Sequence, residues 1–590
     1  MAAKPLKLKR ERAKTVVRSG RYRFTAEVLI DHELTHLDKP FSYGVPTDLL
    51  DFTARGSRVI VPFNGHETEG IVTKIQEGDE LPNKPILKVL SSAFYGDESL
   101  QLADEVAKRY ATTTVKVLRH IPGLGSSRFD EGSDQRKRKR GHRVQRRYLS
   151  KSSFSLDNLI QKLSNVEGDS ILLVPTEREA ALLHSQLHGL FKERVVKAFG
   201  RRKTSISFPK RGVIVGTRGA VFLQVPSLDY MVIFHDSSEH FWSERNPYWN
   251  VRDVALLRSR ISEVDIDFVS GFPSAELSRL MEIGYLHRQN SPRLSLRKRR
   301  RVCSLPDSYH GTIRDGLKNG SVLVQVAHKD YSSLVICQRC RSRPLCDCGF
   351  PLKMANKEGF TCTICGTKIG EWKCKECGST ERLMIGRGAK RIEEELGKAF
   401  PRVPIFLSTK EKPLDDCPEH GIIVATPGMQ PSASIFSALV LLDGELQLNR
   451  PTMRAEERLL DLWFSLIAQS KDTAPIFVSL PSNHRVTQAI AIGSPNRLIS
   501  TILAERKEVK LPPWYRVIRI KSNDLSSLQV NLHEEFNYSI ISRSTASGEL
   551  LIRVPVDKSQ EVIDSILSLV KYRLALKKET ISVEIDPHDL

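Results

Sequence analysis

The sequence predicts an α/β protein built from several domains, and three observations lead to this prediction. Strand-like segments open the chain, two later stretches alternate buried strands with amphipathic helices, and eight of the ten cysteines gather in four close pairs. With 590 residues, of which 40% are hydrophobic, the chain is long enough for three or four separate cores. We expect an N-terminal β-rich domain, two α/β lobes, a cysteine-rich insertion in the second lobe and a C-terminal α+β domain.

The N-terminal domain is expected over residues 1–123. The segments FTAEVLI at 24–30, RVIVPF at 58–63 and GIVTKI at 70–75 are rich in β-branched and aromatic residues, and turn-forming residues lie between them. Residues 99–121 carry apolar side chains at helical spacing. They predict helix that closes this domain before Pro122.

Two runs of Lys and Arg separate the next parts of the chain. RKRKRGHRVQRR at 136–147 and RLSLRKRRR at 293–301 show no apolar periodicity, so neither can bury a face. We expect basic linkers over 124–150 and 293–309, with the first lobe over 151–292. Within that lobe, strand-like SILLVP, GVIVG and YMVIF alternate with helical segments, which is typical of a parallel sheet.

The same alternation indicates a second lobe over 310–336 and 379–500, in the segments SVLVQVA, GIIVAT, ALVLLD and APIFVSL. The cysteine-rich insertion interrupts this lobe at 337–378. The C-terminal domain is expected over 501–590.

The paired cysteines predict two tetrahedral zinc sites, because each site needs four thiolates. Five residues separate the first pair from the second, and thirteen separate the second from the third, which favours nested pairing. The predicted ligands are Cys337, Cys340, Cys374 and Cys377 for one zinc, and Cys346, Cys348, Cys362 and Cys365 for the other. Another thiophilic metal stays open, and so does a purely structural role for the insertion.

The charge of the chain favours a polyanionic partner. Lys and Arg number 90 and Asp and Glu 69, a net charge of +21, which most often faces nucleic acid and less often an acidic membrane. No stretch approaches the roughly 18–20 apolar residues that a bilayer span needs. The basic N-terminus lacks the apolar segment of a secretion leader, and the paired cysteines fit a reducing compartment. We expect a cytoplasmic protein without a membrane partner.

Several motifs in order resemble primosomal protein N-prime, the bacterial replication-restart helicase family PriA. The most specific are the cysteine block followed by Gly386, Gly388, Glu394 and Pro404, then LPPW at 511–514 and VEIDP at 583–587. KPFSYGVPTDLL, RVIVPF and IVGTRGAVF support the resemblance in the same order. It implies a nucleoid-associated bacterial protein that recognises forked or single-stranded DNA. The implied partners are other primosome proteins, the replicative helicase loader and single-stranded DNA-binding protein.

The helicase motifs of that family are missing or altered here. No G-x-x-x-x-G-K-[ST] phosphate loop occurs, and the fragment Gly200–Thr204 lacks the first glycine. The acidic D-E-x-H is replaced by Phe234-His235-Asp236-Ser237, and the Q-x-x-G-R-A-G-R arginines by FSLIAQSKD at 464–472. We expect the first lobe to begin at SILLVP, with the strand, loop and helix that would hold phosphate deleted. Both lobes are therefore interpreted as degenerate and inactive, as in the actinobacterial branch, although whether ATP binds stays open.

The resemblance also implies DNA contacts in the N-terminal domain. Phe41, Ser42, Asn64 and Lys84 match its pocket for a terminal 3′ nucleotide, although the family more often has an acid at 42 and a glycine at 64. Phe41 could stack on a base and Lys84 could neutralise a phosphate. Arg218 follows a strand end, where open α/β sheets place ligand contacts.

These observations predict a zinc-containing replication-restart factor that binds forked DNA and docks other proteins without helicase activity. Two alternatives are an active ATP-dependent helicase with an unrecognised nucleotide site, and a basic zinc-ribbon protein that acts on RNA or transcription complexes.

Overall fold

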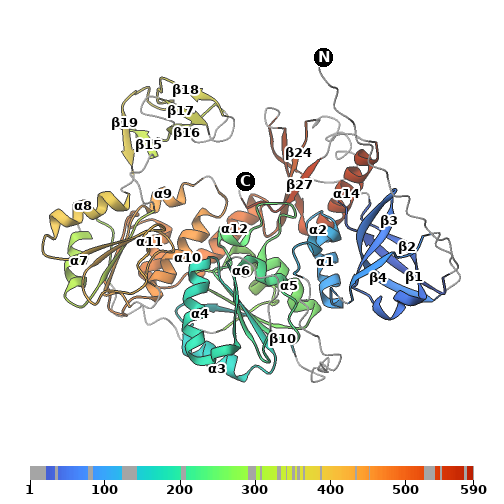
Figure 1. The fold of residues 1–590 in the computed structure, drawn as a ribbon. Coiled ribbons are helices and arrows are strands. Elements are labelled where there is room, and N and C mark those ends of the chain that lie inside the picture. Colours follow the sequence, from blue (N-terminus) through green and yellow to red (C-terminus); the bar gives the residue numbers. More distant parts are fainter. Residues whose placement is uncertain are drawn as a thin grey trace, which may run out of the picture.

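The computed structural model describes residues 22–32, 37–77, 84–92, 94–122, 143–200, 208–289, 301–305, 309–327, 334–340, 342–347, 352–354, 359–362, 366–385, 388–431, 435–450, 452–523, 539–544, 548–576 and 581–588. Figure 1 shows the N-terminal sheet at one end, the first lobe in the middle and the second lobe at the other end. The cysteine-rich insertion stands on the second lobe, and the C-terminal domain lies between the N-terminal sheet and the first lobe. Within the described residues, no helix is long and apolar enough to cross a membrane.

The N-terminal sheet has five antiparallel strands in the order β2-β1-β4-β3-β5. They are β1 (Phe24–Ile30), β2 (Pro40–Val45), β3 (Arg58–Phe63), β4 (His66–Glu77) and β5 (Lys88–Ser91), and a 3-10 helix η2 (Thr47–Phe52) follows β2. The sheet is curled, because a bridge joins Gly44 to Pro85 and the Tyr43 hydroxyl donates to the Pro62 carbonyl on β3 (3.4 Å). The predicted β-rich domain is confirmed.

Residues 99–121 are helical in two pieces, α1 (Asp97–Arg109) and α2 (Thr114–Leu118). Ala111 takes a positive φ of 51° and ends the first helix, and the Thr113 side chain caps the second by accepting from Lys116 N (3.3 Å). The apolar faces of both helices join a core shared with the first lobe and the C-terminal domain. These helices therefore join the N-terminal domain to the rest of the protein.

The first lobe is a sheet of seven parallel strands in the order β12-β6-β11-β10-β7-β9-β8. The strands are β6 (Arg146–Ser150), β7 (Asp169–Leu173), β8 (Val195–Ala198), β9 (Val213–Gly216), β10 (Leu228–Phe234), β11 (Asp265–Ser270) and β12 (His287–Arg288). The helices are α3 (Leu156–Asn165), α4 (Glu177–Phe191), α5 (Val251–Ile261) and α6 (Ala275–Glu282). Short 3-10 turns η3 (Lys192–Arg194), η4 (Arg218–Phe222) and η5 (Glu239–Phe241) complete the lobe.

The prediction that the lobe begins at SILLVP is wrong, because β6 and α3 precede that segment. β6 lies inside the predicted linker 124–150 and pairs with β11 in the middle of the sheet. Tyr148 is buried there, and the buried carboxylate of Asp267 neutralises Arg147 (2.8 Å). The strand, loop and helix at this position are therefore present, and it is their composition that differs from a phosphate loop.

The second lobe is a sheet of six parallel strands in the order β13-β23-β22-β14-β21-β20. The strands are β13 (Val302–Cys303), β14 (Val322–Gln325), β20 (Ile405–Ser408), β21 (Ile422–Ala425), β22 (Ala438–Leu441) and β23 (Ile476–Val478). Its helices are α7 (Tyr309–Leu317), α8 (Ala389–Ala399), α9 (Gly444–Leu448), α10 (Ala455–Ala468) and α11 (Arg485–Ile492). β13 lies within the predicted linker 293–309, and that part of the linker is an edge strand.

The insertion and the C-terminal domain are both small. In the insertion, β15 (Leu334–Cys337) pairs with β19 (Arg382–Ile385), and β16 (Leu352–Met354), β17 (Phe360–Cys362) and β18 (Lys368–Ile369) form a three-stranded sheet. Helix α12 (Asn496–Glu508) spans the predicted boundary at 500/501. It is followed by β24 (Tyr515–Lys521), β25 (Ser539–Ser544), β26 (Glu549–Pro555), the 3-10 turn η8 (Val556–Lys558), α14 (Ser559–Ala575) and β27 (Ser582–Ile585).

Candidate nucleic-acid interface, metal centre and interlobe cavity

Phe41 lies where the curled N-terminal sheet brings β2 toward β3. Its half-buried ring meets the Phe63 ring edge-on, with 5.3 Å between the centroids. The Lys39 ammonium lies 5.6 Å from the centroid of the Phe41 ring. An aromatic ring beside a cation can receive a base and its phosphate, but the same ring also packs on the domain core.

The other three predicted DNA contacts, Ser42, Asn64 and Lys84, differ in how they lie relative to Phe41. Asn64 has a φ of 49° and Gly65 one of 78°, so they form the two-residue turn that joins β3 to β4, which favours asparagine and glycine. Lys84 is exposed, and its carbonyl accepts from Gly44 N (2.9 Å) on β2. Ser42 is exposed on β2, but alternation along the strand turns its side chain away from the face of Phe41.

Four cysteines of the insertion converge on one point. The sulfurs of Cys337, Cys340, Cys374 and Cys377 all lie within 4.8 Å of one another. The distance is 3.4 Å between the Cys337 and Cys377 sulfurs and 3.5 Å between those of Cys340 and Cys374. Each pair sits in a tight loop, in which Cys337 N donates to Ser342 O and Cys374 N donates to Ser379 O, both at 2.9 Å. The predicted pairing of the first cysteine pair with the fourth is confirmed.

This cluster suits a tetrahedral zinc ion. Sulfurs bound to zinc at about 2.3 Å would be separated by about 3.8 Å, close to the separations in the cluster. A disulfide would need about 2.05 Å, so these contacts are between free thiols. Four thiolates in two C-x-x-C loops leave no position for water, which is typical of a structural site.

The second predicted zinc site is described only in part. Cys346 and Cys362 are buried in the small core of the insertion, together with Phe360 and Trp372. Cys348 and Cys365 lie outside the described residues. Among the described residues one four-cysteine cluster is therefore in place, and the second site stays a prediction.

A cavity of about 1630 Å³ lies between the two lobes. Lys151, Phe154, Thr176, His235 and Arg218 line it from the first lobe. The second lobe contributes several side chains of α10 and of neighbouring loops, among them Gln447, Arg450, Arg458, Asp461, Ser465 and Gln469. The cavity faces the carboxyl ends of the first sheet, where α/β proteins usually bind ligands.

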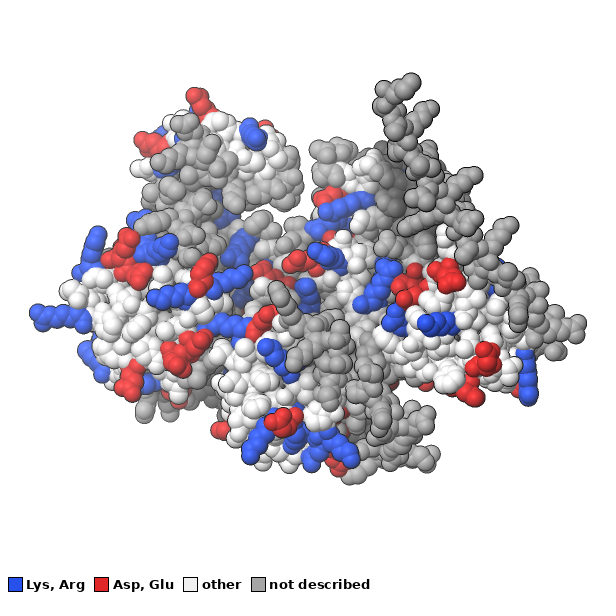
Figure 2. Space-filling view, in the orientation of Figure 1, with Lys and Arg blue, Asp and Glu red and all other residues white. Residues whose placement is uncertain are grey.

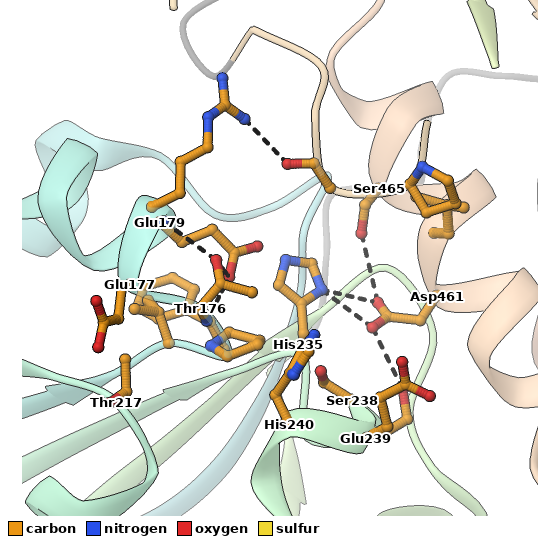
Figure 3. A pocket seen from close by; sticks show the side chains of 18 of the residues that line it. Thr176, Glu177, Glu179, Thr217, His235, Ser238, Glu239, His240, Asp461 and Ser465 are labelled. Atoms are coloured by element: carbon orange, nitrogen blue, oxygen red, sulfur yellow. Dashed lines mark hydrogen bonds and ion pairs between the residues drawn. The ribbon is translucent and has the colours of Figure 1, made fainter. Parts of the chain in front are cut away.

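A histidine and an aspartate join the lobes across this cavity (Figure 3). His235 Nδ1 lies 3.0 Å from Asp461 Oδ2, and Gly271 N donates to Asp461 Oδ1 (2.7 Å). Burial alone would raise the pKa of Asp461, but the His235 charge and hydrogen bonds hold it below its ordinary value. A Cβ on Gly271 would lie 2.4 Å from the Asp461 carbonyl oxygen, so the two lobes touch closely here.

Two aromatic rings line the cavity beside the first sheet. After β6, the Phe154 ring packs edge-on against Phe234 at 5.3 Å, and the Lys151 ammonium lies 5.2 Å from the Phe154 centroid. The helix N-termini that reach this region are already capped: Ser155 accepts from Asn158 N, and Thr176 and Glu179 form a capping box. Arg218 donates to the Trp242 carbonyl, so this predicted DNA contact is already engaged with the protein.

A second buried junction between the lobes is ionic. Glu276 of α6 accepts from Arg454 (2.8 Å and 2.5 Å) and from Arg252 (3.2 Å), and Arg454 is only 1% exposed. Glu457 of α10 pairs with Arg506 of α12 and accepts from Ala275 N (3.0 Å). Burial would raise the pKa of Glu276, but the charges of Arg252 and Arg454 hold it well below its ordinary value.

The junction continues into the N-terminal part of the chain. Asp253, which follows Arg252 on α5, accepts from Arg109 (2.6 Å) and from the Tyr110 hydroxyl (2.8 Å). Burial raises the pKa of Tyr110 above its ordinary value and keeps this hydroxyl protonated as a donor. Charged groups from α1, both lobes and α12 thus form one buried chain of contacts.

Comparisons with known proteins agree with these features. A family model described as the PriA 3′ DNA-binding domain (3′BD) matches residues 27–121. The probable replication restart protein PriA of Mycobacterium tuberculosis is 28% identical over 549 residues, which cover 81% of this chain and 84% of that protein. This chain is similar to PriA over four fifths of its length. Replication restart protein PriA of Rickettsia felis is 25% identical over 361 residues, 54% of this chain and 55% of that protein.

The predicted resemblance to the PriA family is confirmed, and Phe41, Ser42, Asn64 and Lys84 all fall within the matched 3′ DNA-binding domain. Among solved structures, the DExH-box NTPase HrpB of E. coli matches 58% of this chain and 40% of that chain at 12% identity, with a TM-score of 0.30. The arterivirus nonstructural protein 10 helicase matches 80% of both chains at 10% identity, with a TM-score of 0.22. Scores this low carry no conclusion about the fold of this chain.

Sequence reasoning missed Lys151, Asp461 and the ionic junction. Lys151 stands in RRYLSKSSFS, whose charges resemble the end of a linker. Asp461 and Glu457 lie on an amphipathic helix, where acids are ordinarily solvated. One sequence pattern could have indicated these buried charges. The spacing of Arg454, Glu457 and Asp461 places them on one helical face, and that face also carries the buried residues Leu460 and Phe464.

Proposed function

We propose that this chain is a replication-restart factor that recognises forked DNA and assembles other primosome proteins without hydrolysing ATP. The observation that carries the proposal is the match of residues 27–121 to the PriA 3′ DNA-binding domain, within a similarity that covers four fifths of the chain. Its net charge of +21 suits a DNA ligand. Its place of action is the cytoplasm, on the nucleoid DNA.

The chemistry of the interlobe cavity supports the absence of a motor. ATP hydrolysis needs backbone N–H groups on phosphate, a carboxylate for Mg²⁺ and a cation on the transferred group. Here Phe154 and Phe234 stand at the strand ends, both helix N-termini are capped, and Asp461 is engaged by His235 and Gly271 N. The two buried junctions join the lobes through contacts of the protein itself.

The insertion is proposed to hold two zinc ions and to present a surface to partners. Its first site is the Cys337, Cys340, Cys374 and Cys377 cluster, and its second is Cys346, Cys348, Cys362 and Cys365. Figure 1 shows the insertion standing on the second lobe, joined to it by β15 and β19. Arg343 of the insertion donates a hydrogen bond to the Asn449 carbonyl of the second lobe (2.9 Å). The proposed partners are the helicase loader, other primosome proteins and single-stranded DNA-binding protein.

Replacing both Phe41 and Lys84 with alanine should weaken binding to forks that carry a 3′ end at the branch. Loss of one stacked base and one phosphate contact predicts at least a tenfold rise in Kd, since stacking alone contributes about 1–3 kcal/mol per base. Forks with a gap in place of the 3′ end should bind nearly as before. Fluorescence anisotropy on the two forks measures the difference.

The matched control is Phe52→Ala with Lys88→Ala. Both residues are exposed in the same domain, and neither is a predicted DNA contact. This variant should bind both forks like the parent protein. Equal loss on both forks with the Phe41 and Lys84 variant would reduce the domain to an electrostatic clamp, and tighter binding to single-stranded RNA than to forks would favour the RNA alternative.

A further inference from the structure

A further run of positive charge lies outside the basic N-terminus and the two predicted basic linkers. Residues 192–211 contain eight Lys and Arg and a single acid, Glu193. The described members are Lys192 and Arg194 in the turn after α4, Lys197 on β8, and Lys210 and Arg211 just before β9. They lie together at the β8 edge of the first sheet, which is the edge opposite β12. Figure 2 shows Lys and Arg side chains gathered along the lower border of this lobe.

The positive charge of this edge is not neutralised by carboxylates. Arg194 donates from Nε (3.0 Å) and Nη2 (2.8 Å) to the carbonyl of Arg211. Arg211 donates in turn to the carbonyls of Val166 (2.7 Å) and Ser164 (2.9 Å). Among the described residues, none of the five cations forms an ion pair with Asp or Glu, whereas Arg147, on β6 of the same sheet, is paired with Asp267.

These contacts fix Arg194 and Arg211 in place. The two arginines tie the turn after α4, the start of β9 and the end of α3 to one another through backbone carbonyls. Burial and the nearby Arg211 charge lower the pKa of Arg194, which shows that like charges are held close here. Two fixed arginines beside three lysines, none of them in an ion pair among the described residues, gain most from a ligand that brings several negative charges at regular spacing.

Among the described residues of this edge no aromatic ring is fully exposed, and Arg194 and Lys197 lie over the rings of Phe191 (5.2 Å) and Phe199 (4.6 Å). Phe191, Phe199 and Phe208 are the aromatic residues of this segment, and all three are half-buried against the two cores of the lobe. Single strands bind through bases stacked on exposed aromatic rings, whereas a duplex presents only its phosphates and grooves. The surface therefore suits double-stranded nucleic acid.

We propose that Lys192, Arg194, Lys197, Lys210 and Arg211 bind the phosphate backbone of double-stranded DNA, as a second DNA surface distinct from the N-terminal domain. The proposal rests on the proposed function in one respect, that the duplex is an arm of the recognised fork. The N-terminal domain would then hold the branch, while the β8 edge holds an arm without reading its sequence.

The test replaces Lys192, Lys197 and Lys210 with glutamine and titrates a blunt duplex, without fork or free single strand, at several salt concentrations. Among the described residues these lysines donate no hydrogen bond and form no ion pair, and Lys197 contacts the Phe199 ring (4.6 Å), so folding should be nearly unchanged. Each lost phosphate contact reduces the slope of log K against log salt by about 0.9, so the slope should fall by roughly 2–3. Affinity at 0.1 M salt should fall about tenfold or more.

The control carries the same loss of charge elsewhere, at the exposed lysines Lys398, Lys412 and Lys558. A slope and affinity equal to those of this control would overturn the proposal. So would unchanged duplex binding together with weaker binding of an acidic peptide, which would assign the edge to a protein partner. If the parent protein prefers forks no more than blunt duplexes, yet the triple variant weakens both, then the edge is correct and fork recognition is wrong.

Discussion

Replacing Glu276 with glutamine is expected to lower the free energy of unfolding by about 3–5 kcal/mol, because the change leaves buried cations without their counter-charge. Arg454 and Arg252 both direct their guanidinium groups at this carboxylate, and both are at most 5% exposed. Glutamine keeps the shape of the side chain and one acceptor oxygen. The decrease in the free energy of unfolding therefore reports the loss of the negative charge. Urea unfolding followed by circular dichroism should show it as a lower midpoint.

The same helix provides a matched control. Glu282→Gln removes a carboxylate that pairs with Arg279 (2.6 Å) but is half exposed, so the expected cost is about 0–1 kcal/mol. The two variants differ in burial and in the partner lobe. Equal midpoints for Glu276→Gln and Glu282→Gln would contradict the interpretation that the buried ionic junction holds the lobes together.

The effect of Glu276 should also depend on pH. Its folded pKa lies below its ordinary value, so the carboxylate contributes stability at neutral pH and loses it as pH falls through the acidic range. The difference between the parent protein and Glu276→Gln should therefore narrow toward low pH. Unfolding midpoints measured at neutral pH and near pH 4 test this direction.

Replacing Cys374 with serine should release about one metal equivalent per chain and unfold the insertion. Structural zinc in small modules contributes roughly 10–16 kcal/mol to their folding, so a three-thiolate site with an oxygen ligand should bind far more weakly. Metal content by mass spectrometry and limited proteolysis around residues 337–378 measure the two effects. The parent protein should hold two equivalents.

Cys417→Ser is the control for this experiment, because Cys417 lies outside the cluster and its thiol faces the Pro418 carbonyl. It should keep the full metal content. Cys362→Ser should release the other equivalent while the Cys374 site stays loaded. Unchanged metal content in Cys374→Ser would contradict the ligand assignment, and loss of both ions in either variant would indicate one shared cluster.

Local chemistry made some of this structure predictable. The segments 24–30 and 58–63 coincide with β1 and β3, because β-branched residues bounded by turn residues define a strand without help from distant parts. Pairing of the first and fourth cysteine pairs followed from loop lengths alone. The N-terminal contacts Phe41 and Lys84 came only through family resemblance, since no spacing rule marks a nucleotide pocket.

The features that could not be predicted from the sequence depend on contacts between residues that are far apart in the chain. RRYLS forms an interior strand of the sheet, because Asp267, 120 residues later, neutralises Arg147 and the sheet buries Tyr148. Its charges therefore resembled a linker when considered alone. The Glu276 junction joins residues 178 positions apart in the chain, so the helical spacing around Arg454 could indicate a buried charged face but not the carboxylate that neutralises Arg454. Both features were missed because charged side chains are usually exposed, whereas here a distant carboxylate neutralises each arginine.

The central claim is that this chain binds forked DNA and does not turn over ATP. The most direct measurement is ATP hydrolysis by the zinc-loaded protein, with and without forked DNA, alongside fork binding in the same buffer. The account predicts fork binding and no phosphate release above the buffer rate. DNA-stimulated hydrolysis would contradict it, because the cavity walled by Phe154, Phe234 and Asp461 would then have to contain a working nucleotide site.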